Sequence, residues 1–336
     1  MVKRSDGRWQ EVVTINGKRK YFYGKNKSEV MAKIRAYKET ASNAANFDVV
    51  ADEWWEEHEP TLAYNTAKSY KPAKIRAANE FKSIDIAQIT PQQIASYIGV
   101  FAKSHAEKTV KTQLMVFNLI FRYAVEHGYA LVNVARDLSV PKNLPKKKIT
   151  SPTPEDIQRV KQSTNCTFGM FAFWAMYTGL RRGELLALEW KDVDLKNKAI
   201  HVTKSLYHDS NVPKVKVPKT KTSIGDIPIL DVLAKKIKTM HPKKGIVFAN
   251  ENGGYLSETQ FQRQWELYTK ESGVTATPHQ FRHAYATMLY EAGIPPEEMQ
   301  ILLRHAQLST TMNIYTDIRD NKIKSVHSKV YSIDIK

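Results

Sequence analysis

Residues 277–283 read TPHQFRH and residues 303–315 read LRHAQLSTTMNIY. The first stretch is a strong helix start, because Thr277 is a favourable N-cap, Pro278 suits the first helical position and Gln280 can bond back to the cap. We predict that this helix runs to about residue 291, where a Gly and a Pro-Pro pair end it.

Two further short helices are predicted, the first over residues 297–303. The three predicted helices together carry four polar residues of interest. His279 and Arg282 are three residues apart and therefore share one helix face. His305 follows the second helix and Tyr315 lies on the third. Two imidazoles, a guanidinium and a phenol can hold a phosphodiester and attack it without a metal ion. The region therefore favours phosphoryl transfer.

Together with TGLRRGE at residues 178–184, this pattern resembles the tyrosine recombinases of the phage-integrase family. That family has an Arg in its first motif, a Lys on a β-hairpin, His-x-x-Arg, a later His and a Tyr about ten residues beyond it. The resemblance places these roles on Arg181, Lys221, His279, Arg282, His305 and Tyr315. One departure concerns the local backbone, because Arg304 stands where the family usually has Gly before the later His.

The resemblance implies a role for each residue. Tyr315 would attack phosphorus, giving a 3′-phosphotyrosine ester and a free 5′ hydroxyl, and Lys221 would protonate the departing 5′ oxygen. The guanidiniums of Arg181 and Arg282 suit the charged non-bridging oxygens, because each is a planar fork of donors that stays charged. His305 would bond a non-bridging oxygen, and a neutral His279 would help to remove the phenol proton. The ester retains the phosphate bond energy, so re-ligation should need no nucleotide. The complete Arg, Lys, His and Tyr set, without a P-loop or a carboxylate cluster, leads us to expect no metal or other cofactor.

Three of these roles have a neighbouring competitor. The competitors are Arg182 for Arg181, Lys219 for Lys221 and Tyr331 for Tyr315. The spacing to Ile227-Pro228 favours Lys221, and the ten-residue spacing from His305 favours Tyr315. Glu184 is expected to orient the site by hydrogen bonding rather than by proton transfer. Metal binding by the histidines is disfavoured, because the sequence has no carboxylate or Cys cluster beside them.

Composition predicts a polyanionic partner. The 336 residues include 51 Lys and Arg against 34 Asp and Glu, a formal net charge of +17, and nucleic acid is the usual partner of such a chain. The single Cys166 excludes an intrachain disulfide framework and fits a reducing compartment. The N-terminus has no apolar signal region, and the longest apolar run, 168–177, is too short to span a bilayer. We expect the cytoplasm of a bacterial host cell.

Residues 1–46 are predicted to form a separate DNA-binding domain. Strand-like runs over Trp9–Ile15 and Lys18–Tyr23 flank Asn16-Gly17, a strong hairpin signal, and a helix should begin near Ser28. Residues 1–27 hold eight Lys and Arg against two acids. The candidate DNA contacts are Lys18, Arg19 and Lys20. The segment resembles the arm-site-binding domain of many integrases, although a solubilising appendage is an alternative.

Residues 47–140 are predicted to be a helical bundle. Helices are expected from residue 47 and over 65–81, 90–102 and 108–127, the last with one apolar face. The resemblance suggests a core-binding, SAM-like domain, and a plain bundle with solvated lysines explains the segment almost as well. A stiff basic linker over 141–152 offers further candidate DNA contacts: Lys146, Lys147 and Lys148.

The predicted fold is multidomain and mainly α with small β-sheets, ending in a mixed α+β catalytic domain over 153–336. We expect a site-specific DNA recombinase that integrates and excises a phage or mobile element. Its expected partners are double-stranded DNA at core and arm attachment sites, three further copies of the chain on DNA, and an excisionase or host DNA-bending protein. The alternatives are a recombinase that resolves chromosome or plasmid dimers, a type IB topoisomerase and a non-catalytic DNA-binding regulator.

Overall fold

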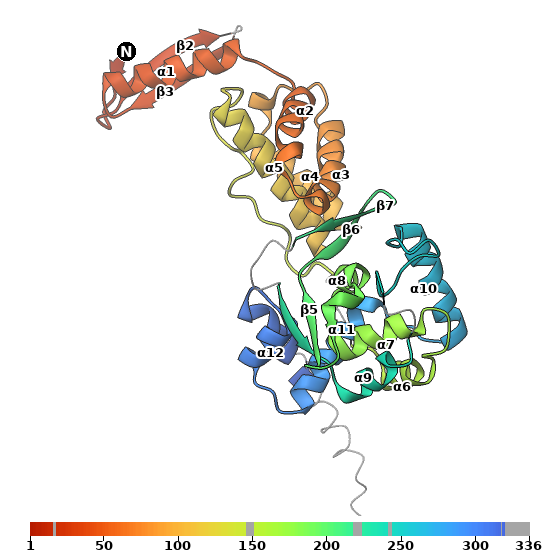
Figure 1. Ribbon diagram of the computed structural model, residues 1–336. Coiled ribbons are helices and arrows are strands. Elements are labelled where there is room, and N and C mark those ends of the chain that lie inside the picture. The colour runs from red at the N-terminus through yellow and green to blue at the C-terminus, as the bar shows by residue number, and fades with distance from the viewer. Residues whose placement is uncertain (16–17, 146–150, 218–223, 241–243, 317, 320–336) are drawn as a thin grey trace, which may run out of the picture. The chain divides into compact units, whose positions relative to one another are not determined.

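The computed structural model describes residues 1–15, 18–145, 151–217, 224–240, 244–316 and 318–319. The chain divides into two compact units, 1–148 and 149–336 (Figure 1). Within the described residues no helix is both long enough and apolar enough to cross a membrane.

The first unit begins with a small antiparallel sheet covered by one helix. The strands lie in the order β1-β2-β3 and the helix is α1: β1 (Val2–Lys3), β2 (Trp9–Ile15), β3 (Lys18–Gly24) and α1 (Lys27–Ser42). The predicted hairpin is therefore confirmed, and Phe22, Val30 and Ile34 form its core. The helix continues to Ser42.

Arg19 and Lys20 are both exposed on β3. Successive strand residues face opposite sides of a sheet, and the Lys20 ammonium lies 4.1 Å from the centroid of the Tyr37 ring of α1. Lys20 therefore shares the helix-covered face with Phe22, whereas Arg19 belongs to the open face. The side chain of Lys18 lies outside the described residues.

The remainder of the first unit is a helical bundle. Its helices are α2 (Phe47–His58), α3 (Tyr64–Glu80), α4 (Pro91–Ala102) and α5 (Glu107–Glu126), with short 3₁₀ turns η1 (Glu59–Thr61) and η2 (Ile86–Gln88). The Phe47 ring lies 5.6–5.9 Å from those of Phe81, Phe117 and Phe121. Thr90 and Gln93 form the reciprocal hydrogen bonds that their spacing predicts. The four predicted helices are all present, within one residue at their starts.

The second unit is mixed α and β (Figure 1). Its helices are α6 (Pro154–Gln162), α7 (Gly169–Thr178), α8 (Arg182–Ala187), α9 (Asp231–Ile237), α10 (Glu258–Ser272), α11 (Pro278–Glu291) and α12 (Pro296–Leu303), with a 3₁₀ turn η3 (Trp190–Asp192). Residues 308–316 are also helical. The strands are β4 (Val193–Asp194), β5 (Ala199–Val202), β6 (Ser205–Asp209), β7 (Val212–Lys216) and β8 (Gly225–Pro228).

Two antiparallel sheets organise these strands, one in the order β4-β5-β8 and one formed by the β6–β7 hairpin. Helix α7 is buried along its whole length and packs against α6, α8, α9 and α11. It ends at Gly179, whose left-handed φ of 61° turns the chain sharply toward α8. A side chain there would strike the Tyr285 ring, so glycine is required both by the turn and by the close approach of α11.

Candidate active site

The start of α11 is held from two sides. The backbone N–H and hydroxyl of Thr277 donate to Gln280 Oε1, at 2.9 and 3.0 Å. Two residues earlier, the backbone N–H and hydroxyl of Thr275 donate to the buried carboxylate of Asp156 on α6, at 2.8 and 2.9 Å. The predicted helix start is thus confirmed, and the first turns, which carry His279 and Arg282, are fixed on α6.

Arg282 is buried, with 4% of its surface exposed. Its Nη1 donates to the Gly179 carbonyl at 2.6 Å and its Nη2 donates to the Leu303 carbonyl. The guanidinium therefore ties together the end of α7 and the end of α12. Burial, followed by repulsion from Arg181, lowers the pKa of Arg282 to about 9. The group stays charged at neutral pH, and its positive charge is poorly compensated.

Arg181 is the N-cap residue of α8 and keeps 39% of its side chain exposed. Its Nη1 donates to Glu184 Oε1 at 2.7 Å, and its Nη2 donates to the Arg304 carbonyl at 3.2 Å. Its backbone N–H donates to Glu184 Oε2 at 3.0 Å. Glu184 therefore orients Arg181 by hydrogen bonding, as expected from sequence.

Glu184 is itself shared between two arginines. Its Oε2 also accepts a hydrogen bond from Arg304 Nη2, at 2.5 Å. Burial alone would raise the pKa of this carboxyl, but Arg304 and Arg181 together hold it below its usual value. Glu184 is ionised in the site and cannot serve as an acid at neutral pH.

Both predicted histidines are neutral at neutral pH. Burial, followed by Arg282 and Arg181, lowers the pKa of His305 to about 4, and its Nδ1 lies 2.8 Å from the Thr311 hydroxyl. His279 lies nearer the surface, and loss of water around it, followed by Arg282 and Arg181, lowers its pKa as well. Neutral rings can accept a proton or donate one hydrogen bond to an oxygen.

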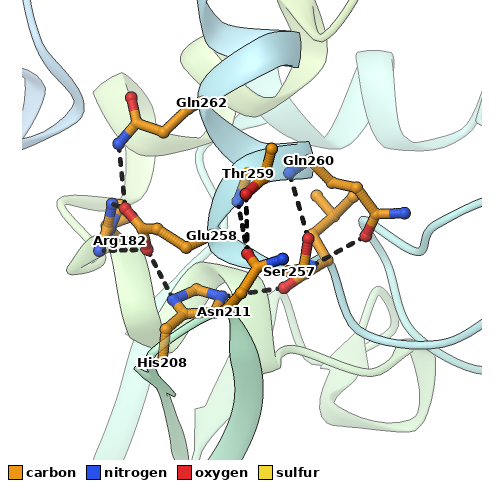
Figure 2. A network of polar contacts seen from close by, with 9 residues as sticks. Arg182, His208, Asn211, Ser257, Glu258, Thr259, Gln260 and Gln262 are labelled. Carbon is orange, nitrogen blue, oxygen red and sulfur yellow. Dashed lines mark hydrogen bonds and ion pairs between the residues drawn. The ribbon is translucent and has the colours of Figure 1, made fainter.

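Arg182, the competitor of Arg181, belongs to another network (Figure 2). Its Nη1 and Nη2 donate to the two carboxylate oxygens of Glu258, at 2.9 and 3.2 Å, and its guanidinium lies over the Phe261 ring. Glu258 also contacts His208 of β6, while Asn211 accepts from the backbone N–H and hydroxyl of Thr259. These contacts fasten the β6–β7 hairpin and α8 to the start of α10, so Arg182 is already engaged in structure.

Tyr315 lies on helix 308–316 and is half-buried. Its ring packs edge-on against Tyr290, with centroids 4.7 Å apart, in the cluster formed by α11 and α12. Tyr290 comes eight residues, roughly two helical turns, after Arg282. Among the described contacts none joins the Tyr315 hydroxyl to Arg181, Arg282 or His305.

Several predicted residues lie outside the described part of the chain. They are Lys221, its competitor Lys219, Tyr331, and the linker lysines Lys146, Lys147 and Lys148. Conversely, sequence reasoning missed two residues that the structure places in the site. Thr311 contacts His305, and Arg304 supplies a third guanidinium, which is buried. Arg304 was visible only as a departure from the family glycine.

The described residues thus gather three guanidiniums, one carboxylate and two neutral imidazoles. This arrangement has an excess of positive charge and suits an anion. In the described ranges no group of three or more His, Cys, Asp or Glu side chains could hold a metal ion. The excess of positive charge fits binding of a phosphodiester.

The chain is similar to known proteins over most of its length. Residues 153–322 match the phage integrase family, and residues 47–140 match the phage integrase central domain. A XerC-like tyrosine recombinase of Caldanaerobacter subterraneus is 28% identical, with 94% of each chain covered. The ICEBs1 integrase of Bacillus subtilis is also 28% identical, over 74% of this chain and 73% of its own length.

Among solved structures, the Tn1549 transposon integrase in complex with transposon right-end DNA is similar in fold. Its TM-score is 0.67 at 19% identity, and the match covers 84% of this chain and all of the other.

Proposed function

The chain belongs to the phage integrase family, and we propose that this tyrosine-type site-specific recombinase integrates and excises a mobile DNA element through a covalent 3′-phosphotyrosine intermediate. The observation that carries the proposal is the cluster of Arg181, Arg282 and His305. The charges of both guanidiniums act on the His305 ring, and this nearness of two cations and a neutral imidazole supports binding of a phosphodiester.

In the proposed reaction the two guanidiniums bind the non-bridging oxygens of the scissile phosphate. Tyr315 attacks phosphorus, its phenol proton passes to a neutral imidazole, and the bond to the 5′ oxygen breaks. Lys221 supplies the proton that the 5′ oxygen needs to leave. The reverse reaction, with a 5′ hydroxyl of another strand, rejoins the DNA without a nucleotide cofactor.

Because Tyr315 packs beside Tyr290, the proposal requires helix 308–316 to shift before attack. Nucleophile and phosphorus must approach within roughly 3–3.5 Å. A conformational step that delivers the phenol would precede the chemistry.

We also propose that three parts of the chain bind different parts of the DNA. Residues 1–46 would bind arm sites, 47–140 core sites and 153–336 the scissile phosphate, with 141–152 as linker. Recombination of two duplexes cuts four strands, and one Tyr315 per subunit therefore calls for four copies of the chain. An excisionase or a host DNA-bending protein would set the direction.

A second candidate is resolution of chromosome or plasmid dimers. The similarity to the XerC-like recombinase over 94% of the chain favours it. The basic N-terminal sheet favours the integrase, because it offers a second DNA-binding surface that simple dimer resolution does not need.

The first test is covalent trapping on a nicked attachment-site DNA. We expect the wild-type protein to form a DNA adduct in EDTA and without nucleotide, and Tyr315→Phe to form none while it binds the same DNA with unchanged affinity. The phenyl ring preserves the contact with Tyr290 and removes only the nucleophilic oxygen. Adduct yield is measured by denaturing gel electrophoresis.

Tyr290→Phe is the matched control, because it removes a neighbouring phenol from the same cluster. We expect it to form adducts. Mass spectrometry should map the modified peptide to residue 315. Adducts from Tyr315→Phe, or an adduct on another tyrosine, would contradict the assignment.

A further inference from the structure

Arg304 occupies an unfavourable place for an arginine. It caps α12 with φ 52° and ψ 48°, the left-handed region that favours glycine, and only 3% of its surface is exposed. A buried guanidinium in strained backbone must be offset by specific contacts. Its contacts therefore indicate what it contributes.

Arg181 and Arg282 together form what we call the arginine clamp, and two different parts of Arg304 reach Arg181 or its partner Glu184. Its side chain donates through Nη2 to Glu184, and its backbone carbonyl accepts from Arg181. Its Nε and Nη1 are buried and have no hydrogen-bond partner among the described residues. The positive charge of Arg304 is thus directed at a single carboxylate.

Charge balance explains the consequence for Arg181. If Glu184 paired with Arg181 alone, the two side chains would have no net charge. The carboxylate would then weaken the attraction of Arg181 for a phosphate. Arg304 provides a second positive charge from the buried side, where only 2% of its side chain is exposed, against 39% for Arg181. The group of three keeps a net charge of +1, located on its exposed member.

We propose that Arg304 is a positioning residue that neutralises Glu184 and so leaves the charge of Arg181 available to the scissile phosphodiester. This inference rests on the proposed function, because it assumes that Arg181 binds that phosphate. Arg304 is too deeply buried to touch the DNA itself. Its role is exerted through Glu184 and through its own carbonyl.

Arg304→Gly removes the charge while keeping the backbone carbonyl, and glycine suits the left-handed conformation. We expect the single-turnover rate of adduct formation, with protein in excess over nicked core-site DNA, to fall roughly tenfold to a hundredfold, as expected for a displaced catalytic group. The affinity for the same DNA should stay within about threefold, since most phosphate contacts lie elsewhere.

The decisive variant is the double substitution Glu184→Gln/Arg304→Gly. Glutamine at the third helical position can still accept a hydrogen bond from the Arg181 backbone N–H. It has no negative charge that would offset the positive charge of Arg181. We expect the double variant to recover most of the lost rate. Arg304→Lys, which retains a charge that can reach Glu184, should cleave faster than Arg304→Gly.

A purely structural link between α12 and α8 gives a different pattern. In that case the double variant is as slow as Arg304→Gly or slower, and that result overturns the inference, as does a wild-type rate for Arg304→Gly. Circular dichroism and DNA affinity establish that each variant is folded. Absence of adducts from the wild-type protein would instead overturn the proposed function, and this inference with it.

Discussion

His305 shows how a single side chain couples the site to pH. Its pKa is about 4 in the folded protein and about 6.5 in an unfolded chain. The unfolded state therefore binds the proton more tightly between these values, and stability falls as pH drops from about 6.5 to about 4. At pH 5 this single group should cost on the order of 2 kcal/mol relative to pH 7.

We predict that His305→Gln loses less stability on acidification than the wild-type protein, by roughly that amount. The measurement is urea unfolding at pH 7 and pH 5, read by hydrogen exchange in α11 and α12 peptides so that the transition belongs to this unit. The control is His201→Gln. His201 is exposed, and Asp226 raises its pKa, so its small contribution has the opposite sign. Equal pH dependence of wild type and His305→Gln would contradict the assigned cause.

At the scale of elements, the turn from α7 to α8 fixes the positions of Arg181 and Arg282. The Gly179 carbonyl binds Arg282, and a Cβ at residue 179 would lie 2.4 Å from Tyr285 Cδ1. We predict that Gly179→Ala destabilises the second unit by about 2–5 kcal/mol. The left-handed backbone contributes about 1–2 kcal/mol and the overlap with the ring about 1–3 kcal/mol. Thermal unfolding measures the change.

Gly253→Ala separates the two causes. Gly253 has φ 77°, but nothing among the described residues lies within 4 Å of a Cβ there. Only the cost of about 1–2 kcal/mol for the backbone should remain. If the two alanine variants were equally stable, the approach of Tyr285 would not constrain this turn.

The elements that sequence predicted best are those with local start signals. Thr-Pro-x-Gln at 277 and at 90 each begins a helix, and each Gln bonds its Thr. Strand β6 was missed because its residues are mostly polar, although Leu206 and His208 alternate inward before a turn. That alternation was the available signal.

Four of the six predicted site residues lie together in the structure, but the bonds that connect them were not predictable from sequence. The family spacing pointed to Arg181, Arg282, His279 and His305, which the structure gathers. The bond between Arg304 and Glu184 joins residues 120 positions apart, and helical periodicity carries no information at that separation. The packing of Tyr315 on Tyr290 depends equally on how α11 and 308–316 meet.

At the scale of the whole molecule, the N-terminal sheet predicts separable DNA-binding activities. We expect a protein of residues 47–336 to form adducts on an isolated core site at close to the full-length rate, because every proposed catalytic residue is retained. It should fail to recombine complete attachment sites, because arm-site binding is lost. Adduct and recombination assays with the same DNA preparations measure both.

The two faces of β3 offer a matched pair of point variants. Arg19→Ala on the open face should weaken arm-site affinity and make its salt dependence shallower by about 0.9 in log–log slope, the value for one phosphate contact. Lys20→Ala should have less effect, since Lys20 lies against Tyr37 on the helix-covered face.

The truncated protein has its own contradicting outcome. Normal recombination of complete attachment sites by residues 47–336 would show that the sheet is not needed to join the sites.

The long-range bonds around the clamp have a consequence for biosynthesis. Arg181 and Arg304 are 123 residues apart, and Arg282 and Gly179 are 103 apart. A chain emerging from the ribosome folds its N-terminal domains first, so the helical bundle can form while the clamp is still incomplete. Nascent or prematurely terminated chains that end before residue 304 would lack both His305 and Tyr315. With His305 and Tyr315 in their proposed roles, such chains would bind DNA without breaking it, so strand cleavage would require translation past residue 315.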